Sequence, residues 1–147
     1  MPTTRNRVPS HTDEAVNREI ERGMVTRVRY YEEHRGQIGA RIRELDEEWD
    51  IERTIEANTS TLALVGIALG TTRDSRRLVL PAVVAGFLFQ HAIQGWCPPV
   101  PILRRLGFRT SYEIERERQA LKALRSDFEG VSSGQDQAER ALAAAAL

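Results

Sequence analysis

An all-α fold built around a two-helix membrane hairpin is the architecture that the sequence predicts. Two apolar segments, residues 57–72 and 78–103, contain no Asp, Glu, Lys or Arg. In the segments that flank them, apolar residues recur at steps of three and four, which is helical spacing. The 147 residues include 21 basic and 21 acidic side chains, so the net charge of zero hides a strong segregation of charge. This balance disfavours a nucleic-acid-binding protein, and we expect no nucleic-acid partner.

The N-terminal part is predicted as an arm followed by a helix. Residues 1–10 are polar and contain two prolines, so we expect a flexible arm rather than a cleaved signal peptide. Residues 11–56 contain no proline and show a near-heptad, coiled-coil-like run from Met24 to Trp49. Two glycines weaken this run, so we expect either two helices that meet near residues 35–39 or one helix that is kinked there. The segment is interpreted as an amphipathic cytoplasmic helical arm.

Residues 57–103 are predicted to form the membrane hairpin. The second span, residues 78–97, would reach about 30 Å as a helix, which matches the hydrocarbon core of a bilayer. The first span is shorter, and its extension to residues 55–72 gives about 27 Å. A buried helix of a soluble bundle usually keeps a polar stripe, whereas residues 78–89 have no polar side chain. The hairpin is therefore favoured over the alternative of two buried helices in a soluble bundle.

A second amphipathic helix is predicted after the hairpin. Thr110 and Glu113 have the spacing of a capping box, which indicates that a cytoplasmic helix begins there and covers residues 110–130. Its apolar stripe consists of Ile114, Leu121, Leu124 and Phe128. We expect this stripe and that of the N-terminal arm to bury against each other or across a dimer. Residues 131–147 form an alanine-rich tail.

The arginines beside the two spans predict the orientation. Three arginines precede the first span and five follow the second, against three in the turn between the spans. The arginines before the first span are Arg41, Arg43 and Arg53, and those after the second span are Arg104, Arg105, Arg109, Arg116 and Arg118. The turn between the spans contains Arg73, Arg76 and Arg77. Positive charge favours the cytoplasmic side, so we expect cytoplasmic termini and a location in the bacterial inner membrane.

Small residues four apart predict close helix packing within the spans. Gly66 and Gly70 lie in the first span, and Ala82 and Gly86 lie in the second. Such pairs leave a flat strip on one helix face, which lets another helix approach closely in lipid. The pattern does not distinguish closure of the hairpin from dimerisation.

Polar side chains and a thiol near the end of the second span are the candidate functional groups. Gln90, His91 and Gln94 interrupt the apolar segment, and intramembrane polar groups are candidates for function. Cys97, the single cysteine, is a candidate for persulfide or redox chemistry. The structural interpretation is that the polar groups reach headgroup water and that Cys97 is a small apolar residue at a helix end.

The interface itself is predicted at three residues that follow these groups. Trp96 has the amphipathic ring that favours the headgroup region, and Arg104 and Arg105 follow the span as charged anchors. No catalytic, cofactor-binding or metal-ligating pattern is found elsewhere, so we expect no cofactor, no metal and no enzymatic activity.

Residues 95–110, GWCPPVPILRRLGFRT, resemble the end of the YgaP-like transmembrane domain, an inner-membrane family of unknown function. Its members tend to finish a two-helix hairpin with Gly-Trp-Cys-Pro, a short apolar stretch, Leu-Gly and a Thr. The resemblance extends over residues 51–110 and implies a membrane hairpin that is dimeric. Some relatives carry a fused rhodanese sulfurtransferase domain, for which this chain has no matching loop.

Three functions follow as hypotheses. The first is a small non-enzymatic inner-membrane protein, whose hairpin contacts lipid and anchors cytoplasmic helices for homodimerisation or for binding an unknown protein partner. The second is a sulfur-transfer or redox accessory protein that uses Cys97. The third is a soluble helical adaptor with the hairpin as its core.

Overall fold

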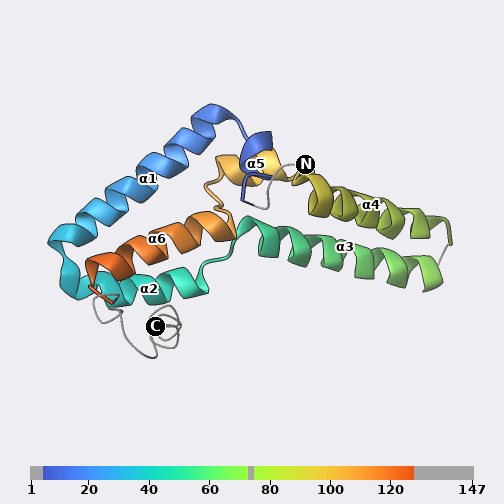
Figure 1. The fold of residues 1–147 in the computed structure, drawn as a ribbon. Helices are drawn as coiled ribbons and strands as arrows, with labels where there is room; N and C mark the ends of the chain where they lie inside the picture. Colours follow the sequence, from blue (N-terminus) through green and yellow to red (C-terminus); the bar gives the residue numbers. More distant parts are fainter. Residues whose placement is uncertain (1–4, 73–74, 128–147) are drawn as a thin grey trace, which may run out of the picture. The chain divides into compact units, whose positions relative to one another are not determined.

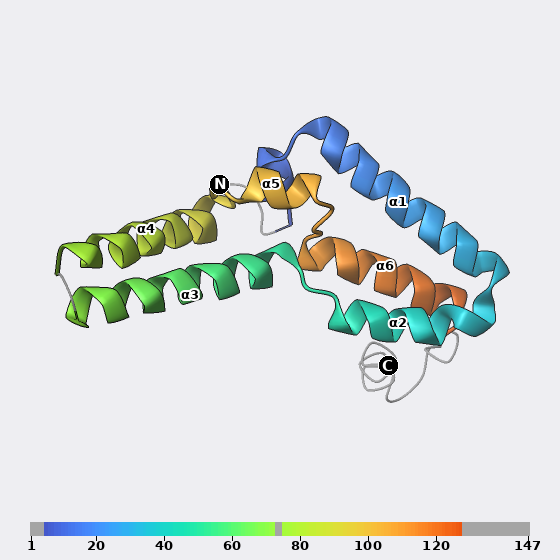
Figure 2. The same ribbon diagram turned by 180° about the vertical axis from the view of Figure 1, so that it is seen from behind.

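A computed structural model describes residues 5–72 and 75–127 of the chain, and the described residues form helices and turns without a strand. The predicted all-α class is confirmed (Figures 1 and 2). The helical elements in chain order are η1 (Pro9–His11), α1 (Glu14–Glu33), η2 (Arg35–Gln37), α2 (Ile38–Glu47), α3 (Ile51–Thr72), η3 (Ser75–Leu78), α4 (Val79–Gln94), α5 (Val100–Arg105) and α6 (Ser111–Leu124).

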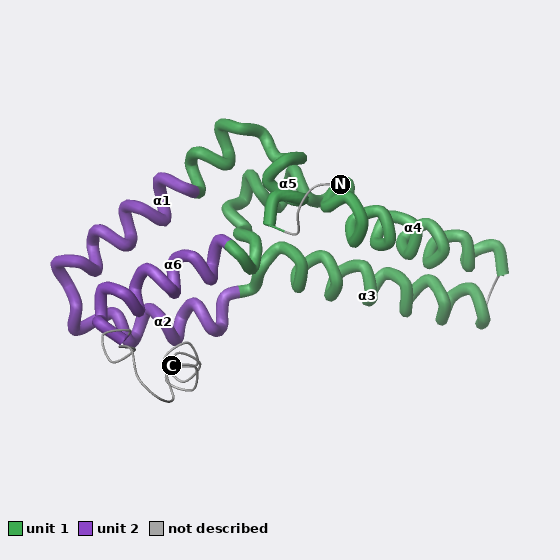
Figure 3. The backbone as a smooth tube through the Cα atoms, viewed as in Figure 1, with its two compact units in different colours: residues 1–20, 49–112 green, residues 21–48, 113–147 purple. Residues whose placement is uncertain are grey.

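The chain divides into two compact units, which Figure 3 shows in different colours. Unit 1 consists of residues 1–20 and 49–112, and unit 2 consists of residues 21–48 and 113–147. Each unit is therefore assembled from two segments that are distant in the sequence. Unit 1 contains α3, α4 and α5, whereas unit 2 contains α2 and α6.

In unit 1, α3 and α4 lie side by side and run in opposite directions, joined through η3 (Figures 1 and 2). α4 ends at Gln94, because Gly95 follows in the left-handed conformation and donates its N–H to the carbonyl oxygen of His91. The helix predicted to continue to Cys97 thus ends three residues earlier, at Gln94.

The core of unit 1 lies where the free ends of α3 and α4 meet the N-terminal segment and α5. It consists of Val8, Ile51, Ile55, Cys97 and Val100, with Leu88, Leu103 and Phe108 packed against it. Val8 belongs to the segment for which a flexible arm is expected, yet its side chain is almost completely buried. The interpretation as a flexible arm therefore does not extend to Val8, because burial of this apolar side chain holds the segment against the core.

The short helix α5 lies between the predicted second span and the predicted C-terminal helix, in a proline-rich stretch for which no helix is predicted. Pro99 is the N-cap residue of α5, and Pro101 lies in its first turn. Proline is tolerated there because the first backbone N–H groups of a helix have no partner within the helix. Gly95 therefore ends α4, and the prolines that follow it belong to the start of a new helix.

In unit 2, the N-terminal arm is divided into α1 and α2 by η2, at the predicted position. A further break after Glu47 was not predicted, and α3 begins after it with Asp50 accepting the backbone N–H of Arg53 (2.6 Å). Trp49 lies in this break in unit 1, where it is 48% exposed and stacks with the guanidinium of Arg53. Its assignment to the buried stripe is wrong, because the break turns it out of the helical register.

The core of unit 2 joins the two predicted stripes within one chain. Ile38, Ile42 and Leu45 of α2 pack with Ile114 and Leu121 of α6, and Tyr31 and Leu124 lie against them. This confirms that the stripes bury against each other. Phe128 and the alanine-rich tail lie outside the described residues.

Candidate functional site

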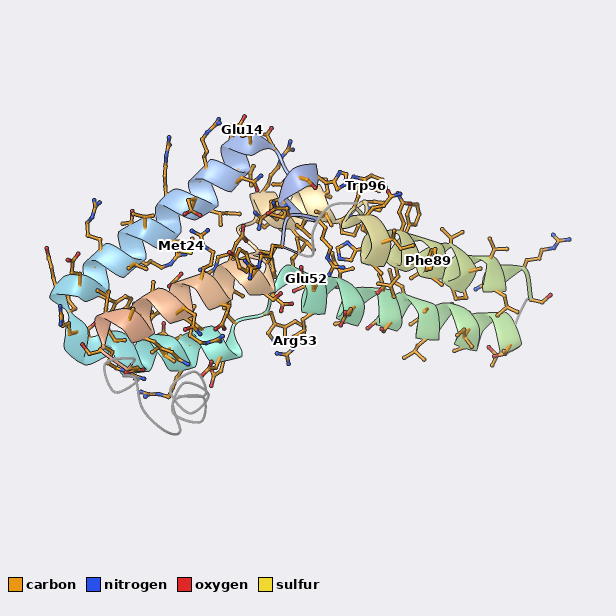
Figure 4. All side chains as sticks on the ribbon, in the orientation of Figure 1. Glu14, Met24, Glu52, Arg53, Phe89 and Trp96 are labelled. Atoms are coloured by element: carbon orange, nitrogen blue, oxygen red, sulfur yellow. The ribbon has the colours of Figure 1, made fainter. Side chains whose placement is uncertain are left out.

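The surface of α3 and α4 is the most unusual feature of unit 1, because large apolar side chains on both helices are exposed. Leu64 on α3 is 68% exposed, and Val79 and Phe89 on α4 are 64% and 69% exposed (Figure 4 labels Phe89). Further exposed apolar side chains on this pair and on η3 between them are Leu62, Val65, Ile67, Leu78, Leu80, Val83, Phe87 and Ile93. Contiguous apolar surface of this kind marks a site for another protein or for a membrane.

One helical stretch of the described residues, Ser75–Gln94, is long and apolar enough to cross a membrane by length and composition. It has 20 residues and a mean hydropathy of 1.3, and only 11% of it is buried. α3 does not reach the same hydropathy over its length, because its first two turns carry Glu52, Arg53 and Glu56. The apolar helix α4 is thus not the buried core helix of this chain.

The four small residues expected at helix contacts fall into two classes. A Cβ atom on Gly66 would lie 2.7 Å from Cδ of Pro81, and one on Gly70 would lie 2.6 Å from Cδ2 of Leu78. These two glycines permit the close approach of α3 to α4 and its preceding turn. In contrast, Ala82 is exposed and a Cβ atom on Gly86 would meet nothing within 4 Å.

The backbone conformation and the close surroundings of residue 95 explain why a glycine follows α4. Its φ of +76° is unfavourable for other residues, and a Cβ atom there would lie 2.5 Å from the carbonyl carbon and oxygen of Arg7. The backbone of Arg7 therefore crosses directly over Gly95. The guanidinium of Arg7 then donates a hydrogen bond to the carbonyl oxygen of Ala92 (3.0 Å). Sequence analysis did not identify either contact, although the glycine that begins Gly-Trp-Cys-Pro was the available signal.

Cys97 lies in the core of unit 1 rather than at an accessible surface. Its side chain is 2% exposed and packs among Val8, Ile51 and Val100. Burial raises the pKa of the Cys97 thiol, which disfavours the reactive thiolate. The structure thus gives Cys97 the environment of a small apolar core residue.

The three polar residues predicted near the end of α4 lie in different environments. Gln94 is exposed and Gln90 is half-buried, whereas His91 is buried. His91 lines a polar cavity in unit 1, together with Arg7 and Glu52. Neither Gln90 nor Gln94 lines this cavity, so the structure separates His91 from its two neighbours.

The three expected interface anchors also differ. Trp96 is half-buried and Arg105 is exposed, but Arg104 is almost completely buried. Arg104 donates hydrogen bonds to Oδ1 of Asn17 (2.9 Å) and to the carbonyl oxygen of Phe108 (3.2 Å). The interpretation of Arg104 as an interface anchor is therefore corrected, since its guanidinium connects α5 to the start of α1 within unit 1.

In the part of the chain that the structure describes, no group of three His, Cys, Asp or Glu side chains is arranged to hold a metal ion. Comparisons of the chain with protein-family models, with curated proteins and with solved structures found no match. The resemblance to the YgaP-like domain therefore stays a prediction.

Proposed function

We propose that this chain is a small non-enzymatic membrane protein, in which α3 and α4 form a hairpin within the bilayer and anchor the charged helices. The observation that carries this proposal is the exposure of the apolar stretch that contains α4, because only 11% of its 18-residue apolar window is buried. Transfer of apolar surface out of water is favourable by about 25 cal/mol for each Å². Lipid contact would remove this surface from water.

The dimensions of the hairpin agree with this role. The 20-residue stretch Ser75–Gln94 has a length of about 30 Å as a helix, equal to the hydrocarbon thickness of a bilayer. Within α3, the charged residues are confined to the first two turns, which leaves residues 57–72 without a charge. We place Glu52, Arg53 and Glu56 at the cytoplasmic headgroup boundary.

The orientation is proposed from the flanking arginines, which favour cytoplasmic termini in a bacterial inner membrane. The helices of unit 2 would then lie in the cytoplasm, where their many ion pairs are compatible with water. Examples of these pairs are Arg116 with Glu21 (2.8 Å) and Arg118 with Asp46 (2.8 Å). We propose that these helices serve self-association or the binding of a protein partner.

A homodimer is proposed on the open face of α4. Gly66 and Gly70 already contact the other half of the hairpin, whereas Gly86 has open space beside it. A helix of a second copy could approach closely along Ala82 and Gly86, as small residues permit in lipid. The variant Gly86→Leu should lower the dimer fraction after cross-linking in membranes, and an unchanged fraction would count against this interface.

Membrane fractionation tests the main proposal. After alkaline carbonate washing, the full chain should remain in the membrane pellet, and recovery in the supernatant without detergent would favour the soluble helical adaptor. In a Cys97→Ser background, Ser75→Cys and Glu14→Cys place single thiols at exposed positions in the turn and on α1. An impermeant maleimide applied to intact cells should label Ser75→Cys and spare Glu14→Cys. The reverse pattern would overturn the orientation.

The sulfur-transfer or redox alternative depends on an accessible Cys97 thiolate. The burial of Cys97 and the raised pKa of its thiol weigh against that role. Detection of a persulfide on Cys97 in the native protein would revive this alternative.

A further inference from the structure

A polar cavity of about 470 Å³ lies in unit 1, at the charged end of the α3–α4 pair. Its polar lining consists of Arg7, Glu52, Glu56, Ser60 and His91. Glu52, Glu56 and Ser60 lie four residues apart on α3 and therefore share one helix face. The volume is within the range of about 300–1,000 Å³ that is typical of small-molecule sites.

Two residues of the lining carry buried polar atoms that lack partners among the described residues. His91 is 5% exposed, and neither Nδ1 nor Nε2 of its ring forms a hydrogen bond there. Nε of Arg7 is likewise buried without a partner, although Nη1 of the same guanidinium is bonded to Ala92. Buried polar groups without hydrogen bonds are costly, so a polar ligand that reached these atoms beside the cavity would be favoured.

The charges in the cavity are of both signs and lie close together. The positive charge of Arg7 and the negative charge of Glu56 both act on the ring of His91. Glu52 is partly buried in the same lining and also interacts with the charge of Arg7. A ligand that satisfies the whole lining needs an anionic group for Arg7 and a cationic group for the carboxylates.

The position of the cavity narrows the choice of ligand. On α3 the charged residues end at Glu56, so in the proposed membrane arrangement the cavity lies at the headgroup boundary. The apolar Leu88 also lines it, and its neighbours Phe87 and Phe89 belong to the exposed apolar surface of α4. A lipid headgroup would enter from this boundary with its acyl chains along the helices.

We infer that the cavity binds the phosphoethanolamine headgroup of a lipid, an inference that rests on the proposed membrane function. The phosphate accepts hydrogen bonds from Nε–H of Arg7 and from the ring N–H of His91. The ammonium donates to the carboxylate of Glu56 and to the hydroxyl oxygen of Ser60.

The side chains that line the cavity should discriminate between lipid headgroups. A trimethylammonium group has no N–H to donate to Glu56, and it is usually bound by aromatic rings. Within residues 5–72 and 75–127, the side chains that line the cavity include no phenylalanine, tyrosine or tryptophan. A phosphocholine headgroup should therefore bind more weakly than phosphoethanolamine, and a phosphoglycerol headgroup lacks the cation altogether.

Native mass spectrometry of the delipidated full chain in detergent tests the inference. Phosphatidylethanolamine, phosphatidylcholine and phosphatidylglycerol with identical acyl chains are titrated separately. We expect phosphatidylethanolamine to bind at least about tenfold more tightly than the other two. Equal affinity for the three lipids would overturn the inference, because binding would then not depend on the headgroup. Carbonate fractionation would report separately on the membrane proposal.

Variants of the lining residues test where the headgroup binds, and soluble ligands test whether the bound group belongs to a lipid. Glu56→Gln and His91→Leu should each remove the preference, whereas Gln94→Leu and Glu44→Gln change matched residues outside the cavity and should retain it. Glu56 is exposed enough that Glu56→Gln should fold even if His91→Leu does not. Soluble O-phosphoethanolamine and inorganic phosphate are titrated in parallel. Binding of either as tightly as the lipid would overturn the assignment to a lipid headgroup.

Discussion

Arg41 places Nε and Nη2 each 3.0 Å from Oε1 of Glu117, whose side chain has no exposed surface. Arg27 holds the other oxygen in the same way, with Nε and Nη2 each 3.0 Å from Oε2. A carboxylate from α6 is thus clamped between arginines of α1 and α2 in the middle of unit 2. Charge-assisted bonds of this kind are strong and directional, so they fix how the three helices pack.

Removal of this carboxylate should destabilise unit 2. Glu117→Ala leaves two arginines without their shared partner, and we expect a loss of about 3 kcal/mol, since Arg27 is partly exposed to water. Glu44→Ala is the control, because Glu44 also pairs with Arg41 but is mostly exposed, and we expect a loss below about 1 kcal/mol. Denaturant unfolding followed by circular dichroism in detergent measures both. Equal losses would show that burial of the pair is unimportant.

The close approach of α3 and α4 predicts a difference between two glycines. Gly66→Ala introduces a Cβ atom 2.7 Å from Cδ of Pro81, so we expect a loss of about 1–3 kcal/mol from overpacking. Gly86→Ala meets no described residue within 4 Å and should be neutral or stabilising by about 0.5–1 kcal/mol. Thermal unfolding of both variants in detergent provides the comparison, and a more damaging Gly86→Ala would contradict the observed packing.

Gly95 should be required for the contact with Arg7. Gly95→Ala combines an unfavourable φ with a clash against the Arg7 backbone, and we expect the N-terminal segment to be released. Gly107→Ala is the matched control, because Gly107 has a similar positive φ (+89°) but open space around it. Trypsin cleavage after Arg7 should accelerate in Gly95→Ala only. Acceleration in both variants would assign the effect to backbone strain rather than to the contact.

Cys97 should react slowly in the native protein. Because burial raises the pKa of its thiol, the thiolate fraction at neutral pH is below that of a free cysteine. Iodoacetamide should label Cys97 at least about tenfold more slowly in the folded chain than after denaturation, as for a buried structural thiol. The labelling rate should still be rising above pH 9. Rapid native labelling would contradict the assignment to the core.

The carboxyl of Glu52 predicts a dependence of stability on pH. Burial is the main cause that raises the pKa of this carboxyl above its ordinary value, so folding favours the protonated form. Its contribution to stability is complete at low pH and is lost as the pH rises through the pKa in the folded state. Glu52→Gln removes this loss. In thermal unfolding, the stability of Glu52→Gln relative to the parent should increase between pH 4 and pH 7. Glu44→Gln is the control. A difference in stability between Glu52→Gln and the parent that does not change with pH would contradict the prediction.

Local sequence patterns were sufficient to predict the helices. Apolar steps of three and four depend only on the geometry of one helix, so they predicted the all-α class and the meeting of the stripes of α2 and α6. The glycines near residue 36 indicated where the N-terminal arm divides. The segregation of charge likewise identified the apolar stretch that forms α4. Each of these features is encoded within a few turns of chain.

The candidate site depended on contacts that span the chain. Arg7 bonds to Ala92, Arg104 to Asn17 and Arg27 to Glu117, each across 85 residues or more. A periodic pattern carries no information about such pairs, because each partner has the composition of an ordinary surface position. Trp49 was therefore assigned to the core and Arg104 to the surface, whereas in the structure Trp49 is exposed and Arg104 is buried. The sequence predicts which segments are helical and which are apolar, and long-range packing determines which of their polar groups are buried together.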